Sequence, residues 1–324
     1  MKKDKKVFIL IEVVLAMLVL IVLLFMFQER ADQGVKKIAV VVPNSDHSRW
    51  ASFKYGLQMA ETDFDVETVV VSTGETLTAE EEAELMESEI DNGADGILVQ
   101  PAAGDDMRET LERIGKKTPV VQVESTVYTD EENVKIASVE PEHYAMGKTL
   151  AEEILLDYNG SLGGKTIGIL SGDKGSAASE ERKAGLTAGL KDAGGEILWS
   201  VDGYLDAEEI LSPAAYPRVD IIVALDDSSF VAVGEINAKG SLNGAVLYGI
   251  GSSTEAFYYL DNGFAECLVV PDEFHVGYQG LAVLADDLRD SHKAEDYPEV
   301  AYTTVRRETL FTEENQNILF TMIQ

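Results

Sequence analysis

From Lys36 onward, short apolar runs rich in β-branched residues alternate with longer segments in which apolar and polar positions follow a helical period. The short runs are typical of strands covered on both faces, and the longer segments are typical of amphipathic helices. The predicted strands cover residues 38–42, 66–71, 96–99, 119–123, 166–170, 197–199, 219–225 and 246–250. The predicted helices cover residues 48–62, 78–92, 105–115, 142–158, 177–193, 228–239, 253–262 and 274–290. Repeated β-α-β units of this kind predict an α/β fold with doubly wound parallel sheets.

Eight units are too many for one open sheet, so we expect two similar lobes. A polar turn at residues 129–133 interrupts the alternation and marks the break between them. A TIM barrel is the alternative for eight βα units, but this interruption and the unequal repeat lengths argue against it. Ligands of open α/β sheets bind outside the carboxyl ends of the strands, so the natural site is a cleft between the two lobes.

The first thirty residues carry a different pattern. Residues 1–6 are a basic start, and in residues 7–27 Glu12 is the one ionisable side chain. A helix of that length crosses a bilayer core of about 30 Å. A cleaved signal peptide is the alternative, but its apolar region is usually shorter, and Glu29 fits a cleavage site poorly. We therefore expect one uncleaved transmembrane signal anchor that leaves residues 31–324 outside the cytoplasm.

Composition excludes several classes of protein. The 324 residues include 26 Lys and Arg against 58 Asp and Glu, a formal charge of −32, and such a surface repels nucleic acid. The single cysteine, Cys267, excludes an internal disulfide and a cysteine-built zinc site. The four histidines are not spaced as HExxH or HxH, so no histidine-rich metal site is expected.

Motifs for catalysis and cofactor binding are incomplete. Residues 164–166 resemble the end of a phosphate loop, but Asn159 stands where its first glycine is required. No GxGxxG follows the first strand, so a dinucleotide site is not predicted. Asp226 and Asp227 suit either a metal site or the N-cap of the helix that begins near Ser228, and we favour the cap.

Several segments, in their order and spacing, point to one family. In the first half these are a first strand with an aromatic loop and helix start (residues 37–56) and a third strand that ends in Gln-Pro (residues 93–101). In the second half they are a loop and helix start (residues 175–185), a strand that ends in Asp-Asp (residues 224–227) and a crossover that returns to the first lobe (residues 263–277). Together, residues 36–310 resemble the type I periplasmic binding proteins of the ribose and galactose cluster, which share their fold with the effector domains of LacI-type repressors. The repressor branch needs an N-terminal helix-turn-helix, and the apolar segment stands there instead.

This resemblance implies two lobes joined by three crossovers and a hinge that closes a cleft on a small polar ligand. It implies no catalysis, no cofactor and no metal. The chain is then expected to begin with a basic start (residues 1–6), an anchor (7–27) and a linker (28–35). The N-terminal lobe comprises residues 36–138 and 272–296, the C-terminal lobe comprises residues 139–271 and 297–311, and residues 312–324 are a tail.

The family's binding positions transfer to eight residues of this chain. They are His47, Arg49, Trp50, Gln100, Glu124, Ser125, Glu180 and Asp226. Trp50 suits a platform for a ligand ring, or a core tryptophan beside Phe53. His47 suits a donor to the ligand or a helix cap, and Gln100 suits a ligand contact or a surface turn.

Four positions depart from the sugar-binding pattern. Glu124-Ser125 stands where the family has an Asp-Arg pair, and Glu180 stands where it has an arginine. Gly251 replaces an aspartate of the family, and Pro271 replaces a glutamine. If Glu124, Glu180 and Asp226 all face the cleft, the site is acidic, and burying unpaired carboxylates is costly. We therefore expect a sugar-like neutral ligand or a cationic one rather than an anion. Neutralisation by Arg49 and Arg182 is the alternative.

The leading functional hypothesis is a membrane-anchored extracytoplasmic solute-binding protein that delivers a small polar ligand to the permease of an ABC importer. The alternative is a ligand-sensing module that reports to a sensor kinase in the membrane. A hydrolase on the same scaffold is a third hypothesis.

Overall fold

The first of two sheets is built from short, buried, β-branched runs. The computed structural model describes residues 34–74, 77–128, 136–172, 175–203, 216–240, 242–289, 298–313 and 315–316. The strands of this sheet are β1 (Lys36–Val41), β2 (Val66–Val70), β3 (Gly96–Val99), β4 (Val120–Val123) and β5 (Ala137–Val139). Their order is β2-β1-β3-β4-β5, and the pairings of β1 with β3, β3 with β4 and β4 with β5 are parallel.

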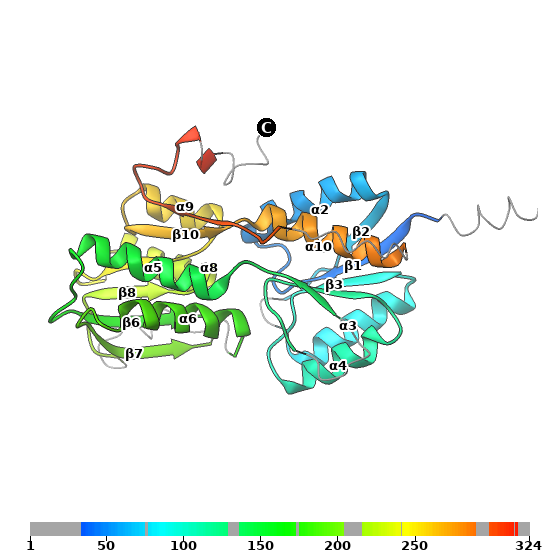
Figure 1. Ribbon diagram of the computed structural model, residues 1–324, viewed down its shortest axis with the longest axis horizontal. Helices are drawn as coiled ribbons and strands as arrows, with labels where there is room; N and C mark the ends of the chain where they lie inside the picture. Colours follow the sequence, from blue (N-terminus) through cyan, green and yellow to red (C-terminus); the bar gives the residue numbers. More distant parts are fainter. Residues whose placement is uncertain are drawn as a thin grey trace, which may run out of the picture. The chain divides into compact units, whose positions relative to one another are not determined.

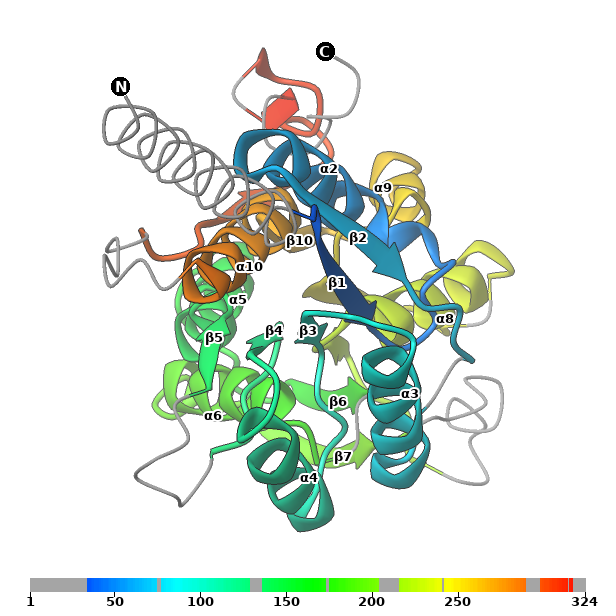
Figure 2. The ribbon, with the colours of Figure 1, turned by 90° about the vertical axis from the view of Figure 1, so that its right-hand side faces the viewer.

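Helices cover both faces of this sheet, which explains why its strands lack polar alternation (Figure 2). The covering helices are α2 (Ala51–Phe64) and α10 (Glu273–Leu288) on one face, and α3 (Ala79–Asp91) and α4 (Asp105–Gly115) on the other. Along β1, Ile38 and Val40 pack with α2 and α10, whereas Ala39 and Val41 pack with α3 and α4. We call this sheet and its helices the N-terminal lobe.

The second sheet has six strands and forms the C-terminal lobe. They are β6 (Thr166–Ser171), β7 (Glu196–Asp202), β8 (Ile221–Ala224), β9 (Val246–Ile250), β10 (Cys267–Pro271) and β11 (Tyr302–Val305). Their order is β11-β10-β9-β8-β6-β7. Every pairing is parallel except that of β10 with β11, which is antiparallel.

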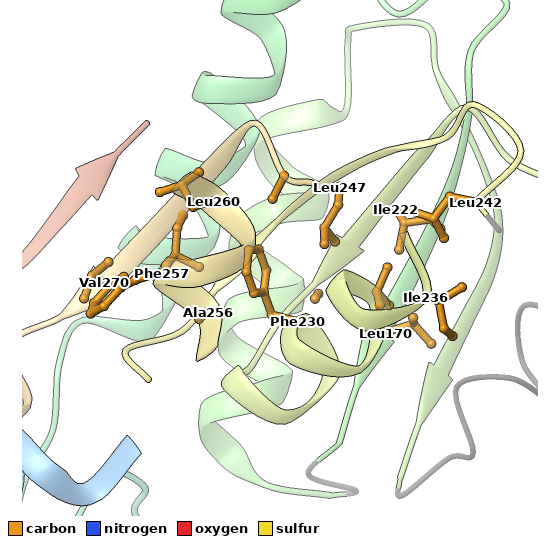
Figure 3. Close-up of a cluster of buried hydrophobic side chains, with 14 of the residues drawn as sticks. Leu170, Ile222, Phe230, Ile236, Leu242, Leu247, Ala256, Phe257, Leu260 and Val270 are labelled. Carbon is orange, nitrogen blue, oxygen red and sulfur yellow. The ribbon is translucent and has the colours of Figure 1, made fainter. Parts of the chain in front are cut away.

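Two pairs of helices cover the two faces of the second sheet (Figure 1). They are α5 (His143–Asp157) with α6 (Ala177–Leu190), and α8 (Asp227–Ala238) with α9 (Thr254–Asp261). Figure 3 shows the cluster under α8 and α9, in which Phe230, Leu247 and Leu260 are at most 1% exposed. Burial of such side chains contributes roughly 1.5–3 kcal/mol each and is the main source of stability in each lobe.

Glycines allow two helix pairs to approach closely. A Cβ at Gly147 of α5 would lie 1.9 Å from the Arg182 carbonyl oxygen of α6, and one at Gly185 would lie 2.0 Å from the Tyr144 carbonyl oxygen. The pair α2 and α10 repeats this arrangement, because a Cβ at Gly277 would lie 2.2 Å from the Phe53 carbonyl oxygen. Real side chains do not fit at such distances, so both pairs depend on glycine.

The chain passes between the two sheets three times. It leaves β5 of the first sheet for α5, returns from β10 of the second sheet to α10, and comes back to the second sheet at β11. At the third passage Arg306 bonds to α5, at 2.7 Å from Glu153 and 3.0 Å from Asp157.

The predicted pair of α/β lobes with parallel sheets is confirmed, and two open sheets replace the TIM barrel alternative. All eight predicted helices are present, with ends that differ by a few residues. Three strands were not predicted. Strand β5 is short and polar, β10 is a buried apolar run that ends in Pro271, and β11 is an antiparallel edge strand.

The predicted anchor at residues 7–27, with the start at 1–6, lies outside the described residues, as does most of the tail at 312–324. Among the described residues, no helix is both long enough and apolar enough to cross a membrane.

Candidate functional site

Polar residues gather where the parallel strands of both sheets end. Gln100 follows β3 and Glu124 follows β4 in the N-terminal lobe, while Asp226 follows β8 and Ser252 follows β9 in the C-terminal lobe. Strand order reverses between β1 and β3 in the first sheet and between β6 and β8 in the second. Such switch points open a crevice at the carboxyl ends of the strands, where α/β proteins bind ligands.

Arg49 and Gln100 form one polar pair in the N-terminal lobe. The loop after β1 ends in a short 3-10 helix, η1 (Ser48–Trp50), which carries Arg49. The Arg49 guanidinium donates a hydrogen bond of 2.7 Å to the Gln100 side-chain oxygen and stacks on the Trp50 ring, 4.1 Å from its centroid. Stacking and the hydrogen bond fix a long side chain that is otherwise costly to order.

Trp50 and His47 hold this loop in place. The Trp50 ring is 1% exposed, donates from its indole nitrogen to the Pro43 carbonyl at 2.9 Å, and meets Phe53 edge-on at 5.1 Å. His47 caps η1, because its Nδ1 accepts from the Arg49 amide at 3.2 Å. In this structure Trp50 therefore packs in the core, with Arg49 on its face.

Glu124 is held in a backbone conformation that is uncommon for a residue with a side chain. Its φ is 64°, in the left-handed region, and its side chain is 5% exposed. His143, in the first turn of α5, bonds through Nε2 to the Glu124 carbonyl at 2.8 Å. Such conformations persist where surrounding contacts over-determine them, and they cluster at functional sites.

Arg182 supports this arrangement from α6. Its Nε donates to His143 Nδ1 at 3.1 Å, and its Nη1 donates to the Leu225 carbonyl at 3.0 Å. Because Arg182 can only donate, Nδ1 accepts and the His143 proton lies on Nε2, where it is donated to Glu124. Burial alone would raise the pKa of nearby Glu140, but the neighbouring His143, the Thr126 hydroxyl and the charge of Arg182 outweigh it and lower that pKa.

Glu273 brings a second buried carboxyl group beside Glu124. It lies in the first turn of α10, is 8% exposed, and accepts from the Ser252 hydroxyl at 3.3 Å. Burial raises the pKa of Glu273 well above its usual value, and the neighbouring Glu124 raises it further, while Arg49 and Arg182 lower it. The two carboxyl groups and the two guanidinium groups thus form one electrostatic cluster with members from both lobes.

Asp226 is a cap with all its contacts within the C-terminal lobe. Its Oδ1 accepts from the Ser229 amide at 2.9 Å and the Ser228 hydroxyl at 2.7 Å, and its Oδ2 accepts from the Gly172 amide at 2.6 Å and the Ser171 hydroxyl at 2.9 Å. The N-cap predicted for this position is confirmed. Asp226 ties the ends of β6 and β8 together.

Asp227 organises the loop after β9. Its Oδ1 accepts from the amides of Ser252 and Ser253, both at 2.8 Å. A Cβ at Gly251 would lie 2.8 Å from this same oxygen, so a larger residue there would displace the Asp227 carboxylate. The position that departs from the sugar-binding pattern is therefore filled by the Asp227 carboxylate.

Besides the bond between His143 and the Glu124 carbonyl, three side-chain contacts join the lobes at the site. The Ser48 hydroxyl donates to Glu255 of α9, Ser125 lies 3.4 Å from Ser176 at the start of α6, and Ser252 donates to Glu273. Each of these three contacts pairs residues from different lobes, so opening the lobes at the site would break them.

The structure gathers most of the predicted residues and leaves one apart. Arg49, Gln100, Glu124 and Ser125 lie in or beside the cluster, supported by Trp50, His47 and Asp226 as described above. Glu180 is exposed and lines a shallow groove along α6 with Lys183, so it does not join Glu124 and Asp226. The acidic site that the sequence predicted from Glu124, Glu180 and Asp226 is therefore formed by Glu124 and Glu273 instead.

Sequence reasoning missed Glu273 because it missed β10. Cys267–Pro271 is a wholly buried apolar run, and recognising it as a strand places Asp272 and Glu273 at a carboxyl end. Gln100 and Glu124 were selected because ligands bind at the carboxyl ends of parallel strands, and the same criterion selects Glu273 once β10 is recognised.

Comparisons with known proteins agree with this geometry. The family described as periplasmic binding protein domain matches residues 38–291. No curated protein matches the chain in sequence.

Solved structures share the fold at low sequence identity. A carbohydrate transporter solute-binding protein from Agrobacterium radiobacter, in complex with D-arabinose, has a TM-score of 0.77 at 16% identity, covering 89% of this chain and 99% of that chain. GanP, a glucose-galactose binding protein from Geobacillus stearothermophilus, has a TM-score of 0.73 at 17% identity, covering 86% and 100%. A chain of the XylFII-LytSN complex has a TM-score of 0.70 at 15% identity, covering 85% and 99%.

These likenesses extend over nearly the whole length of each solved chain, and the family match covers most strands of both sheets of this one. The chain therefore belongs to the periplasmic binding protein family.

Proposed function

We propose that this protein traps a small polar solute between its two lobes and delivers it to an ABC importer outside the cytoplasm. The observation that carries this proposal is the polar cluster at the carboxyl ends of both sheets, with partly buried Arg49 and buried Glu124 from one lobe and buried Arg182 from the other. Such a cluster is expensive to bury unless a polar partner completes it. Membership of a family of binding proteins supports the same conclusion.

The proposed contacts divide into two groups. Arg49, Gln100, Glu124 and Ser125 reach the ligand, together with Glu273, which the sequence did not suggest. His47, Trp50 and Asp226 hold the loops that carry them. We propose lobe boundaries of 36–138 with 272–296 and 139–271 with 297–311, supported by the sheets to which β5, α10 and β11 attach.

We also propose an uncleaved anchor at residues 7–27, which keeps the binding lobes at the extracytoplasmic surface of the cell membrane. The length and apolarity of that segment support it. The full-length chain is expected to stay with membranes after high-salt and carbonate washing, with its original N-terminus. A soluble chain that begins near Asp32 would contradict the anchor.

The second candidate is a sensor module that reports ligand binding to a membrane kinase. The observation that favours it is the likeness to a chain of the XylFII-LytSN complex. The genes beside this one distinguish the two: a permease and an ATPase support import, whereas a kinase and a response regulator support sensing.

A thermal-unfolding screen of the full-length chain tests binding itself. The compounds are sugars, polyols, amines and nucleosides. A ligand at 100 times its dissociation constant adds about 2.7 kcal/mol to the free energy of unfolding. A stabilising compound must lose its effect in Arg49→Ala, whereas an unchanged effect there would place binding elsewhere.

A further inference from the structure

Two buried carboxyl groups at the site each have an oxygen without a hydrogen-bond partner. They are Glu124 Oε1 and Glu273 Oε2, on side chains that are 5% and 8% exposed. An unsatisfied buried acceptor costs about 1–3 kcal/mol, and more when the group is charged. A donor placed between the two groups would satisfy both oxygens at once.

We propose that Glu124 and Glu273 together hold the protonated amine of an amino sugar or amino polyol. This inference rests on the proposed function and names the ligand class of the same site. The ammonium group donates to both unpartnered oxygens and offsets the charge that the two carboxylates place in a buried site.

The surrounding cations are already engaged. Arg49 donates to Gln100 and stacks on Trp50, while Arg182 donates to His143 and to the Leu225 carbonyl. Asp227, which binds the Ser252 amide, adds a further buried carboxylate with one unpartnered oxygen. The balance of fixed charge around the pair is thus negative when both glutamates ionise.

An organic amine suits the pair better than a metal ion or a hydroxyl. Among the described residues, no group of three or more His, Cys, Asp or Glu side chains is arranged to hold a metal ion. A hydroxyl has one proton to donate and no charge, whereas an ammonium has three protons and one charge. The ammonium alone satisfies both carboxylates at once.

Ligand binding then releases a proton. Without ligand, burial and the neighbouring Glu124 raise the pKa of Glu273 and so favour the protonated form of its carboxyl group. The ammonium brings its own proton into the site, so Glu273 ionises and its proton passes to solvent. A neutral polyol leaves the Glu273 proton in place.

Two matched series of compounds test the inference by calorimetry on the full-length chain in mild detergent at pH 7. One series is D-glucamine, D-sorbitol and D-gluconate, and the other is D-glucosamine, D-glucose and D-glucuronate. In at least one series, the amine is expected to bind at least ten times more tightly than the hydroxyl compound, and the carboxylate is expected not to bind. In two buffers of different ionisation enthalpy, the heat for the amine is expected to reveal proton release.

Glu124→Gln and Glu273→Gln are each expected to reduce amine affinity at least tenfold, and by a larger factor than they reduce the affinity of the hydroxyl compound. Glu180→Gln is the control and leaves all affinities unchanged. Proton release in the wild-type chain is an independent readout if a variant unfolds. Equal or tighter binding of the hydroxyl compound, or binding of the amine without proton release, would overturn the inference and leave the proposed function standing. Absence of binding by all six compounds would overturn it too, while the broader thermal screen decides the proposed function separately.

Discussion

Glu82 is a buried carboxyl group outside the binding cluster. It is 1% exposed on α3, and its Oε2 accepts from the Ala102 amide at 2.7 Å while its Oε1 has no partner. Burial raises the pKa of Glu82 to about 8, although the Ala102 hydrogen bond opposes this shift. Glu82 is therefore protonated in the folded state at neutral pH and ionised in the unfolded state.

This raised pKa makes stability depend on pH. Between about pH 4.5 and pH 8 the folded state holds a proton that the unfolded state has lost, so stability falls as pH rises. Glu82→Gln mimics the protonated group and keeps an acceptor for Ala102. We predict that it removes a slope of up to about 1.4 kcal/mol per pH unit and raises stability at pH 7.5.

Denaturant unfolding at several pH values measures this effect, with exposed Glu84→Gln as the control. A parallel pH dependence in the wild type and in Glu82→Gln would show that Glu82 is ionised in the folded protein.

Asp226 illustrates a residue whose role is structural although it lies at the site. Asp226→Ala removes the cap of α8 and leaves the Gly172 and Ser229 amides without their partner. We predict a loss of about 2–4 kcal/mol in the free energy of unfolding. Asp192→Ala, at an exposed position, is expected to change it by less than about 0.5 kcal/mol. Equal effects of the two substitutions in chemical denaturation would refute this role.

At the scale of elements, the close helix crossings depend on glycine. Gly277→Ala forces a Cβ against the Phe53 carbonyl, so α10 must move away from α2. We predict destabilisation of about 1–3 kcal/mol, measured as a lower denaturation midpoint. Gly34→Ala is the control, because its Cβ would meet nothing within 4 Å. An unchanged midpoint for Gly277→Ala would mean that the two helices are not in contact as described.

Elements were predictable where burial fixes the pattern of apolar residues. Strands buried on both faces appear as short continuous apolar runs, and amphipathic helices repeat apolar residues with a helical period, so the positions of both follow from the sequence. The edge strands β5 and β11 do not, because an edge strand is stabilised by its neighbour and keeps polar residues such as Thr303. The left-handed φ of Glu124 was likewise beyond prediction, since it depends on the contact with His143.

At the scale of the whole molecule, the Ser48–Glu255 hydrogen bond links η1 of the N-terminal lobe to α9 of the C-terminal lobe, outside the cluster of carboxyl and guanidinium groups. The pKa of Glu255 is lowered, chiefly because the Ser48 hydroxyl donates to its carboxylate. A contact that exists only when the lobes are close favours the closed state, and the apparent affinity scales with the closed fraction.

We predict that Ser48→Ala weakens ligand binding a few-fold through a faster off-rate, because an exposed polar contact contributes no more than about 1 kcal/mol. Stopped-flow dissociation kinetics measure this, with exposed Ser88→Ala as the control. A change confined to the association rate would argue against a role in closure.

We expect the ligand to lie between the lobes at the carboxyl ends of both sheets. A crystal structure of the chain with the compound that stabilises it most in the thermal screen would locate the ligand. Ligand density is expected in contact with Gln100 and Glu124 from one lobe and with groups of the other lobe, and a polar group of the ligand is expected within hydrogen-bond distance of Glu273. Density on an outer surface of either lobe, with the Glu124–Glu273 pair unchanged, would refute binding between the lobes.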